Sequence, residues 1–84
     1  MDKILDQFLA VDPQILQGKP CFRGTRISVY VILELLEGNL KPEQIVSDDY
    51  YPELTLDHIR AALHFAALSA KNQHYFLFPR PSGS

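Results

Sequence analysis

Basic residues beside glycines are the feature of this 84-residue sequence that points most directly to a chemistry, and that chemistry is phosphate binding. The sequence has GKP at residues 18–20 and RGTR at residues 23–26. Glycine lets a backbone approach phosphate oxygens closely, while lysine and arginine neutralise their charge. The segment is not a Walker loop, because no Gly-Lys-Ser/Thr follows a strand. Alternatively, Arg23 and Arg26 form ion pairs with acidic residues between 43 and 57.

The charges are unevenly distributed along the chain, whose net charge is −2. Residues 18–30 carry three bases and no acid, residues 31–57 carry seven acids and one base, and residues 58–84 carry three bases and no acid. The negative total argues against a general nucleic-acid-coating protein. If the two basic segments meet in the fold, they form a local patch that binds phosphate. A mixed, solvent-facing surface is the alternative.

The elements that position these residues are predicted to be mainly helical. Residues 8–11 predict a short strand, and the glycines and prolines of 17–26 predict a hairpin after it. From Ser28, an N-cap residue, the apolar period becomes that of a helix, which ends at Gly38. Its apolar side is predicted to hold Val31, Ile32, Leu35 and Leu36, and its polar side Tyr30, Glu34 and Glu37. A two-turn helix follows over 42–48, and a longer one over 56–71 with Thr55 as its cap.

This order of helices is that of a helix-turn-helix unit, whose last helix enters the DNA major groove by its N-terminal residues. The sequence therefore predicts that His58, Arg60 and His64 face the groove. Lys19, Arg23 and Arg26 are predicted to hold the DNA backbone. The alternative is a three-helix core without a nucleic-acid role, because many small domains share this architecture.

The last helix carries more apolar surface than one core contact requires. A helical wheel predicts a core face that consists of Leu56, Ile59, Ala62, Leu63, Ala66 and Ala70. Opposite it lies a polar stripe, in or beside which Ala61, Phe65 and Leu68 fall. We expect either the C-terminal tail or a second copy of the chain to cover this additional surface.

Residues 73–84 form an aromatic and proline-rich tail after a single domain of residues 1–72. The tail is predicted to fold back on the domain, to swap onto a second copy, or to dock on another protein. The predicted partner or dimer interface accordingly consists of Phe65, Leu68, Tyr75, Phe76 and Phe78. A homodimer is expected.

Several classes of protein are not expected from this sequence. No apolar stretch reaches the ~20 residues that span a bilayer, and no signal peptide is recognisable, so a cytoplasmic protein is expected. The single Cys21 forms no internal disulfide and is predicted to lie in the core. His58 and His64 lie on different sides of one helix, so no metal site is expected. We expect no cofactor and no catalysis.

The string GKPCFRGTRISVYVILELLEGNLKPEQIVSDDYYPELTLDHIRAALHFA resembles the bacterial domain-of-unknown-function family 433. The match covers about residues 12–67, and Cys21-Phe22 stands where aliphatic residues are usual. The resemblance implies a homeodomain-like three-helix bundle preceded by a β-hairpin. It also implies the antitoxin half of a two-gene toxin-antitoxin system, with a PIN-like ribonuclease as partner, promoter DNA as target and no enzymatic activity.

The predicted fold is thus mainly α, a homeodomain-like helix-turn-helix bundle with a short N-terminal β-hairpin. The predicted function is that of a DNA-binding, antitoxin-like regulator. The alternative is a protein-interaction module that binds a nuclease or a second copy and never touches DNA.

Overall fold

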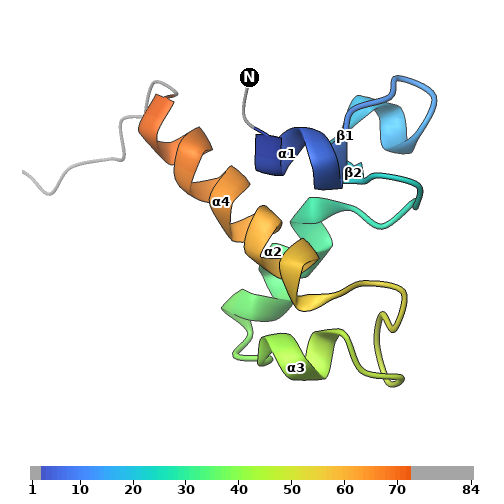
Figure 1. Cartoon of the computed structure of the whole chain (residues 1–84), viewed down its shortest axis with the longest axis vertical. Helices are drawn as coiled ribbons and strands as arrows, with labels where there is room; N and C mark the ends of the chain where they lie inside the picture. The colour runs from blue at the N-terminus through green and yellow to red at the C-terminus, as the bar shows by residue number, and fades with distance from the viewer. Residues whose placement is uncertain (1–2, 73–84) are drawn as a thin grey trace, which may run out of the picture.

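The computed structural model describes residues 3–72, which form a mainly helical fold with one small hairpin (Figure 1). Within these residues there are four α-helices and a two-stranded antiparallel sheet. In chain order they are α1 (Lys3–Phe8), β1 (Leu9–Ala10), the 3₁₀ turn η1 (Leu16–Gly18), β2 (Cys21–Phe22), α2 (Val29–Glu37), α3 (Pro42–Ile45) and α4 (Leu56–Asn72). The predicted mainly-α class with a hairpin is confirmed.

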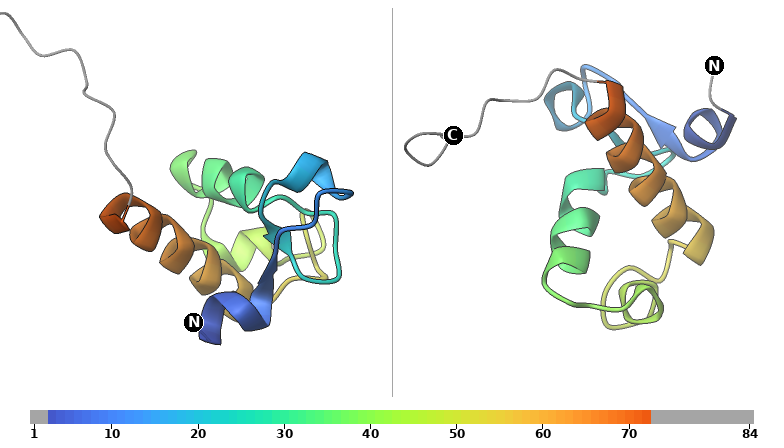
Figure 2. Two further views of the ribbon diagram at one scale, coloured as in Figure 1. Left: turned by 90° about the horizontal axis from the view of Figure 1, so that it is seen from above. Right: turned by 90° about the vertical axis from the view of Figure 1, so that its left-hand side faces the viewer.

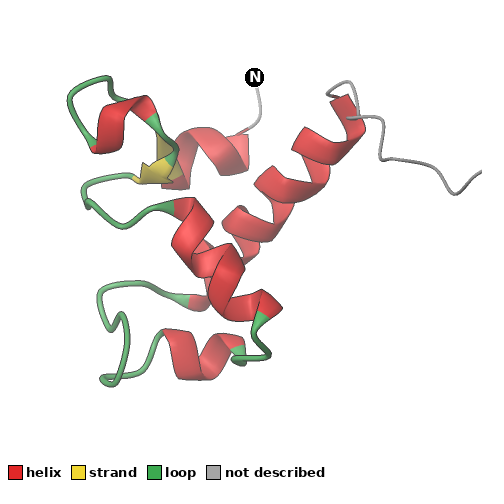
Figure 3. Cartoon of the chain, turned by 180° about the vertical axis from the view of Figure 1, so that it is seen from behind, coloured by secondary structure: helices red, strands yellow, loops and turns green. Residues whose placement is uncertain are grey.

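Helix α4 is the element against which the other helices pack (Figures 1 and 2). It contacts α1 on one side and α2 on the other, while α3 lies near its N-terminal end. The two strands pair Leu9 with Phe22 and Ala10 with Cys21, and they join α1 to the rest of the domain (Figure 3). The hairpin and α1 are therefore one unit that is fastened to α4.

The core takes at least one large side chain from each of four elements. Phe22 of β2, Ile32 of α2, Ile45 of α3 and Ile59 of α4 are almost completely buried. Cys21 is buried as well, which confirms its predicted place in the core.

Helix α2 begins and ends at the predicted residues. The Ser28 hydroxyl accepts a hydrogen bond from the Tyr30 amide at 3.1 Å, as an N-cap does. At the other end, the amides of Asn39 and Leu40 donate to the carbonyls of Leu36 and Leu35, each at 3.0 Å. This is a Schellman motif, in which one residue adopts a left-handed conformation.

The left-handed residue at the end of α2 is Asn39, with φ of 74°, whereas Gly38 has φ of −80°. Asparagine tolerates this conformation because its short polar side chain bonds locally. Gly38 is therefore the C-cap residue of α2, but its backbone does not adopt the left-handed conformation that glycine favours.

Three elements differ from the sequence prediction. Residues 3–8 form helix α1, which was not predicted, and the predicted strand over 8–11 is reduced to Leu9–Ala10. Helix α3 ends at Ile45 and not at residue 48, because the chain turns there. The Ser47 hydroxyl donates to the Gln44 carbonyl at 2.6 Å, and the Tyr51 amide returns to the Ile45 carbonyl at 2.9 Å.

Helix α4 is rotated relative to the predicted core face. Ile59 and Ala62 of that face are buried as predicted, but Leu56 and Leu63 are 51% and 49% exposed. Ala61, which was predicted in or beside the polar stripe, is completely buried. The unpredicted helix α1 is the physical reason, because it covers one side of α4 and α2 covers another. The solvent-facing side of α4 that results carries Leu56, Leu63, Ala67 and Ala70, and we call these four residues the exposed stripe.

Two glycines should respond to alanine with opposite signs. Gly24 has φ of +80°, so Gly24→Ala should cost about 1–2 kcal/mol of stability through backbone strain alone. Gly38 has an ordinary φ, and a Cβ there would meet only the carbonyls of Glu34 and Leu35, at 3.5 and 3.6 Å. Gly38→Ala should therefore stabilise by ~0.4–1 kcal/mol. Urea unfolding of both variants measures the two effects, and a shift in the same direction would contradict the assignment.

Candidate partner and nucleic-acid interface

The RGTR segment forms a closed turn, and its hydrogen bonds are directed inward. The Phe22 amide donates to the Ile27 carbonyl at 3.0 Å, and the Thr25 amide donates to the Phe22 carbonyl at 2.9 Å. The Thr25 hydroxyl donates to the Phe22 carbonyl and accepts from the Ile27 amide. Gly24 provides the left-handed residue that this turn needs. The three amides named here are thus used by the turn and do not offer a cradle for phosphate.

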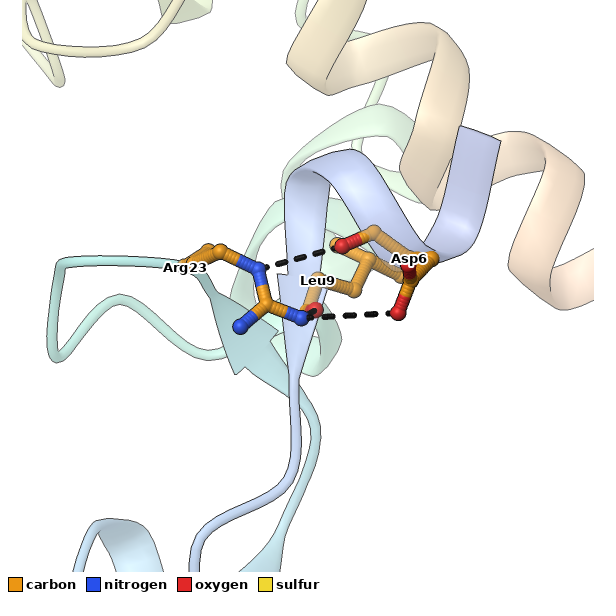
Figure 4. Close-up of polar contacts among 3 residues, drawn as sticks. All are labelled: Asp6, Leu9 and Arg23. Carbon is orange, nitrogen blue, oxygen red and sulfur yellow. Dashed lines mark hydrogen bonds and ion pairs between the residues drawn. The ribbon is translucent and has the colours of Figure 1, made fainter. Parts of the chain in front are cut away.

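Arg23 fastens helix α1 to the hairpin (Figure 4). Its Nε donates to the Asp6 carbonyl at 3.1 Å, and its Nη2 donates to the Leu9 carbonyl at 2.8 Å. Its own amide donates to the Phe8 carbonyl at 2.8 Å. The carbonyls in the last turn of a helix have no partner within it, and a cation there also interacts favourably with the helix dipole. Arg23 therefore caps the C-terminal end of α1.

The ion pair of Arg23 is with Asp6, at 3.9 Å, and not with an acidic residue of 43–57. The alternative that Arg23 pairs with an acidic residue of 43–57 is therefore wrong. Both side chains are more than half exposed, so water screens this pair. The contacts to backbone carbonyls hold the guanidinium in place, which leaves Arg23 less available to DNA than the prediction assumed.

Lys19, Arg26 and Arg60 are the predicted DNA contacts that remain available. All three are exposed, and none has an ion-pair partner among residues 3–72. They come from three parts of the fold: Lys19 precedes β2, Arg26 lies in the RGTR turn between β2 and α2, and Arg60 lies in the second turn of α4.

His58 has a structural role at the start of α4. Its Nδ1 accepts from the Thr55 amide at 3.0 Å, and the Thr55 carbonyl accepts the first hydrogen bonds of the helix. This is half of a capping box, with imidazole in the place where glutamate is usual. The ring also meets Phe8 and Phe22 edge to face, with centroids 5.0 and 5.7 Å apart. His58 is half-buried and faces the hairpin.

His64 is half-buried on α4. Among the residues described, no group of three histidine, cysteine or acidic side chains lies close enough together to hold a metal ion. Over the same residues, no helix is long and apolar enough to cross a membrane.

Two apolar grooves lie on either side of Pro20 and Phe65, and together we call them the Phe65 groove. The first has a volume of about 470 Å³ and is lined by Leu5, Asp6, Leu9, Ala10, Val11, Pro20, Arg23 and Phe65. The second, of about 310 Å³, is lined by Lys19, Pro20, Ser28, Val29, Tyr30, Leu33 and Phe65. Tyr30 stands at its edge, where a hydrogen bond to Glu34 and the charge of that carboxylate raise the pKa of the phenol.

Of the predicted interface residues, Phe65 lines this groove and also packs against the core, and Leu68 is half-buried. Tyr75, Phe76 and Phe78 lie outside the described residues. The sequence analysis did not identify the other wall of the groove. Val11 and Tyr30 belong to that wall and are 66% and 64% exposed, a property that only the folded chain shows.

The hairpin, α2, α3 and most of α4 coincide with a known family. The family model DUF433, described as "Protein of unknown function", matches residues 9–66. This chain belongs to the DUF433 family. The resemblance seen in the GKP and RGTR motifs is thereby confirmed.

A solved structure shares the fold. The crystal structure of a DUF433 member protein from Anabaena variabilis ATCC 29413, at 2.00 Å resolution, superposes with a TM-score of 0.70 and 22% sequence identity. The superposition covers 82% of this chain and 66% of that protein, so this chain spans slightly less than two thirds of its length. Among curated proteins, none matches the sequence.

The DUF433 region contains Arg23 but not the helix that Arg23 caps. Residues 3–8 precede the matched region, and the Arg23 side chain and amide bond to them, while Phe8 meets the ring of His58. Helix α1 in turn determines which face of α4 is left in solvent. Arg23 thus connects the family motif to the surface that this particular chain exposes.

Replacing Arg23 should cost more stability than removing its ion pair. Arg23→Ala loses two hydrogen bonds from a charged donor and should cost about 1–2 kcal/mol. Asp6→Asn keeps the Asp6 carbonyl and should cost less than ~0.5 kcal/mol, because the pair is screened. Chemical unfolding compares them, with Arg26→Ala as the control for loss of a nearby cation. An equal cost for Arg23→Ala and Asp6→Asn would show that the ion pair, and not the cap, matters.

Proposed function

We propose that this DUF433 protein is an antitoxin-like regulator that acts by binding another protein, and the exposed stripe of α4 is the observation that carries the proposal. Leu56 and Leu63 lie on the same side of the longest helix and are each about half exposed. Ala67 and Ala70 continue that side toward the C-terminal end. When a partner covers leucine side chains aligned in this way, their apolar surface is removed from water, and this favours association.

The spacing of the stripe suits a helix as the partner's contact element. Leu56, Leu63 and Ala70 are seven residues apart, which is the repeat of helices that pack side by side. The small side chains of Ala67 and Ala70 allow a second backbone to come near. Arg60 lies beside the stripe and gives it a polar rim, as protein interfaces have. The antitoxin role itself is supported by the family resemblance, which makes a PIN-like ribonuclease the first candidate partner and a second copy of the chain the alternative.

A charge in the stripe should weaken partner binding without unfolding the protein. We expect Leu63→Glu to weaken the complex with the protein encoded by the adjacent gene about tenfold or more, because a carboxylate would be desolvated beside apolar side chains. Tyr50→Glu is the matched control, since Tyr50 is 44% exposed in the loop before α4. Co-expression followed by calorimetric titration measures affinity. Equal affinities for the two variants would exclude the stripe.

Light scattering on the chain alone tests whether a second copy of the chain covers the exposed stripe. A dimer that Leu63→Glu converts to monomer would assign the stripe to self-association. A monomer at all concentrations would leave the stripe free for the encoded partner.

Promoter DNA is the second candidate ligand, and the three exposed cations favour it. Lys19, Arg26 and Arg60 have no acidic partner among residues 3–72, so their charge is available to phosphate. The order of α2, α3 and α4 supports a homeodomain-like arrangement. Two observations place DNA second. The connection over 46–55 is longer than the ~3–4-residue turn of a helix-turn-helix. The exposed acids Glu53 and Asp57 flank the start of α4 and repel phosphate.

Salt dependence tests the DNA proposal. If Arg26 contacts phosphate, Arg26→Ala should weaken binding to DNA from the protein's own promoter and reduce the slope of log affinity against log salt by about one. Arg60→Ala should cost ~1–3 kcal/mol on that sequence only, if Arg60 reads a base. Lys71→Ala, at the far end of α4, is the control. Fluorescence anisotropy over a salt series measures all four proteins, and affinity that does not change with salt would exclude DNA as a ligand.

A further inference from the structure

We infer that the aromatic segment 74–79 of this chain is the ligand of the Phe65 groove. The segment has the sequence HYFLFP, and a single residue separates it from the end of α4. This inference does not depend on the proposed function, because the groove and the exposed stripe occupy different sides of α4. Phe65 lies two residues beyond Leu63, which is about 200° around the helix.

The chemistry of the groove favours an apolar ligand with rings. Its two parts have volumes of about 470 and 310 Å³, within the range of ~300–1,000 Å³ that is typical of ligand pockets. Apolar side chains such as Leu9, Val11, Leu33 and Phe65 provide most of the lining. Aromatic side chains gain most from such burial, since each removes roughly 150–250 Å² from water.

The division of the groove into two parts matches the spacing of the rings. Pro20 and Phe65 line both parts, so a ligand that follows the groove passes across these two residues. Two rings separated by one residue lie on the same side of an extended chain. Phe76 and Phe78 have this separation, and one ring for each part is the arrangement that we propose.

The length of the chain allows the segment to reach the groove of its own molecule. Asn72 ends α4, and Phe65 lies seven residues before it, which is about 10 Å along the helix axis. Four extended residues span roughly 13 Å, so residues 73–76 are long enough to bring Phe76 back to Phe65. No second molecule is required, and the short connection gives the segment a high effective concentration at the groove.

Nuclear magnetic resonance of the full-length chain tests the inference. We expect nuclear Overhauser contacts between the rings of Phe76 or Phe78 and the methyl groups of Val11 and Leu33. In the double variant Phe76→Ser/Phe78→Ser these contacts disappear, and the amide shifts of Ala10 and Leu33 move. Arg80→Ser, which changes the tail but not its rings, is the matched control and should leave these shifts unchanged.

A variant in the groove tests the same contact without changing the tail. Val11 is 66% exposed, so Val11→Glu should leave the fold intact while placing a charge in the groove. It should reduce the same ring-to-methyl contacts. A sample that mixes labelled and unlabelled chains separates the sources of the signal. Contacts found only between different molecules would overturn the inference in favour of a second copy. Amide shifts of Ala10 and Leu33 that are the same with and without the Phe76→Ser/Phe78→Ser change would overturn it altogether.

Discussion

The burial of Phe22 is the constraint on which the rest of this structure depends. Phe22 is completely buried, and its ring meets His58 of α4. Its amide and carbonyl close the RGTR turn, and the next residue, Arg23, bonds to the end of α1. Through the Phe22 ring, the Phe22 backbone and Arg23, this short stretch of chain connects the RGTR turn, α1 and the first turn of α4. In a domain this small, few other contacts could replace it.

The position of α1 explains which surface is left for binding. Helix α4 has apolar residues around most of its circumference, so its sequence is compatible with more than one buried face. Packing of α1 and α2 buries Ala61 and Ala62 and leaves Leu56 and Leu63 in solvent. The Arg23 cap that holds α1 thus acts at a distance on the exposed stripe. A change at the hairpin would therefore alter the partner binding that we propose, although no hairpin residue belongs to the stripe.

Local signals in the sequence were sufficient to predict some parts of the fold and not others. Ser28 and the helical period of the apolar residues predicted α2. This signal is local, because the Ser28 hydroxyl bonds to an amide only two residues further along the chain. The exposed face of α4 could not be predicted in this way, since it depends on a helix that begins more than fifty residues earlier. Arg23 is a similar case. Its acidic neighbours downstream suggested a partner, whereas the carbonyls at the end of α1 bind it more effectively because they lack partners of their own.

Backbone groups of the fold and DNA compete for the same side chains, and this competition decides the roles of the predicted site residues. A cation or imidazole that already bonds to backbone groups has fewer hydrogen-bonding atoms left for DNA, and any change of its position on binding would cost some of those bonds. Arg23 and His58 are in this situation, whereas Lys19, Arg26 and Arg60 are not. Apolar side chains on the stripe carry no such cost, since covering Leu56 and Leu63 removes only water. For this reason a protein partner is the stronger proposal, and any DNA binding would have to come from cations that the fold does not itself use.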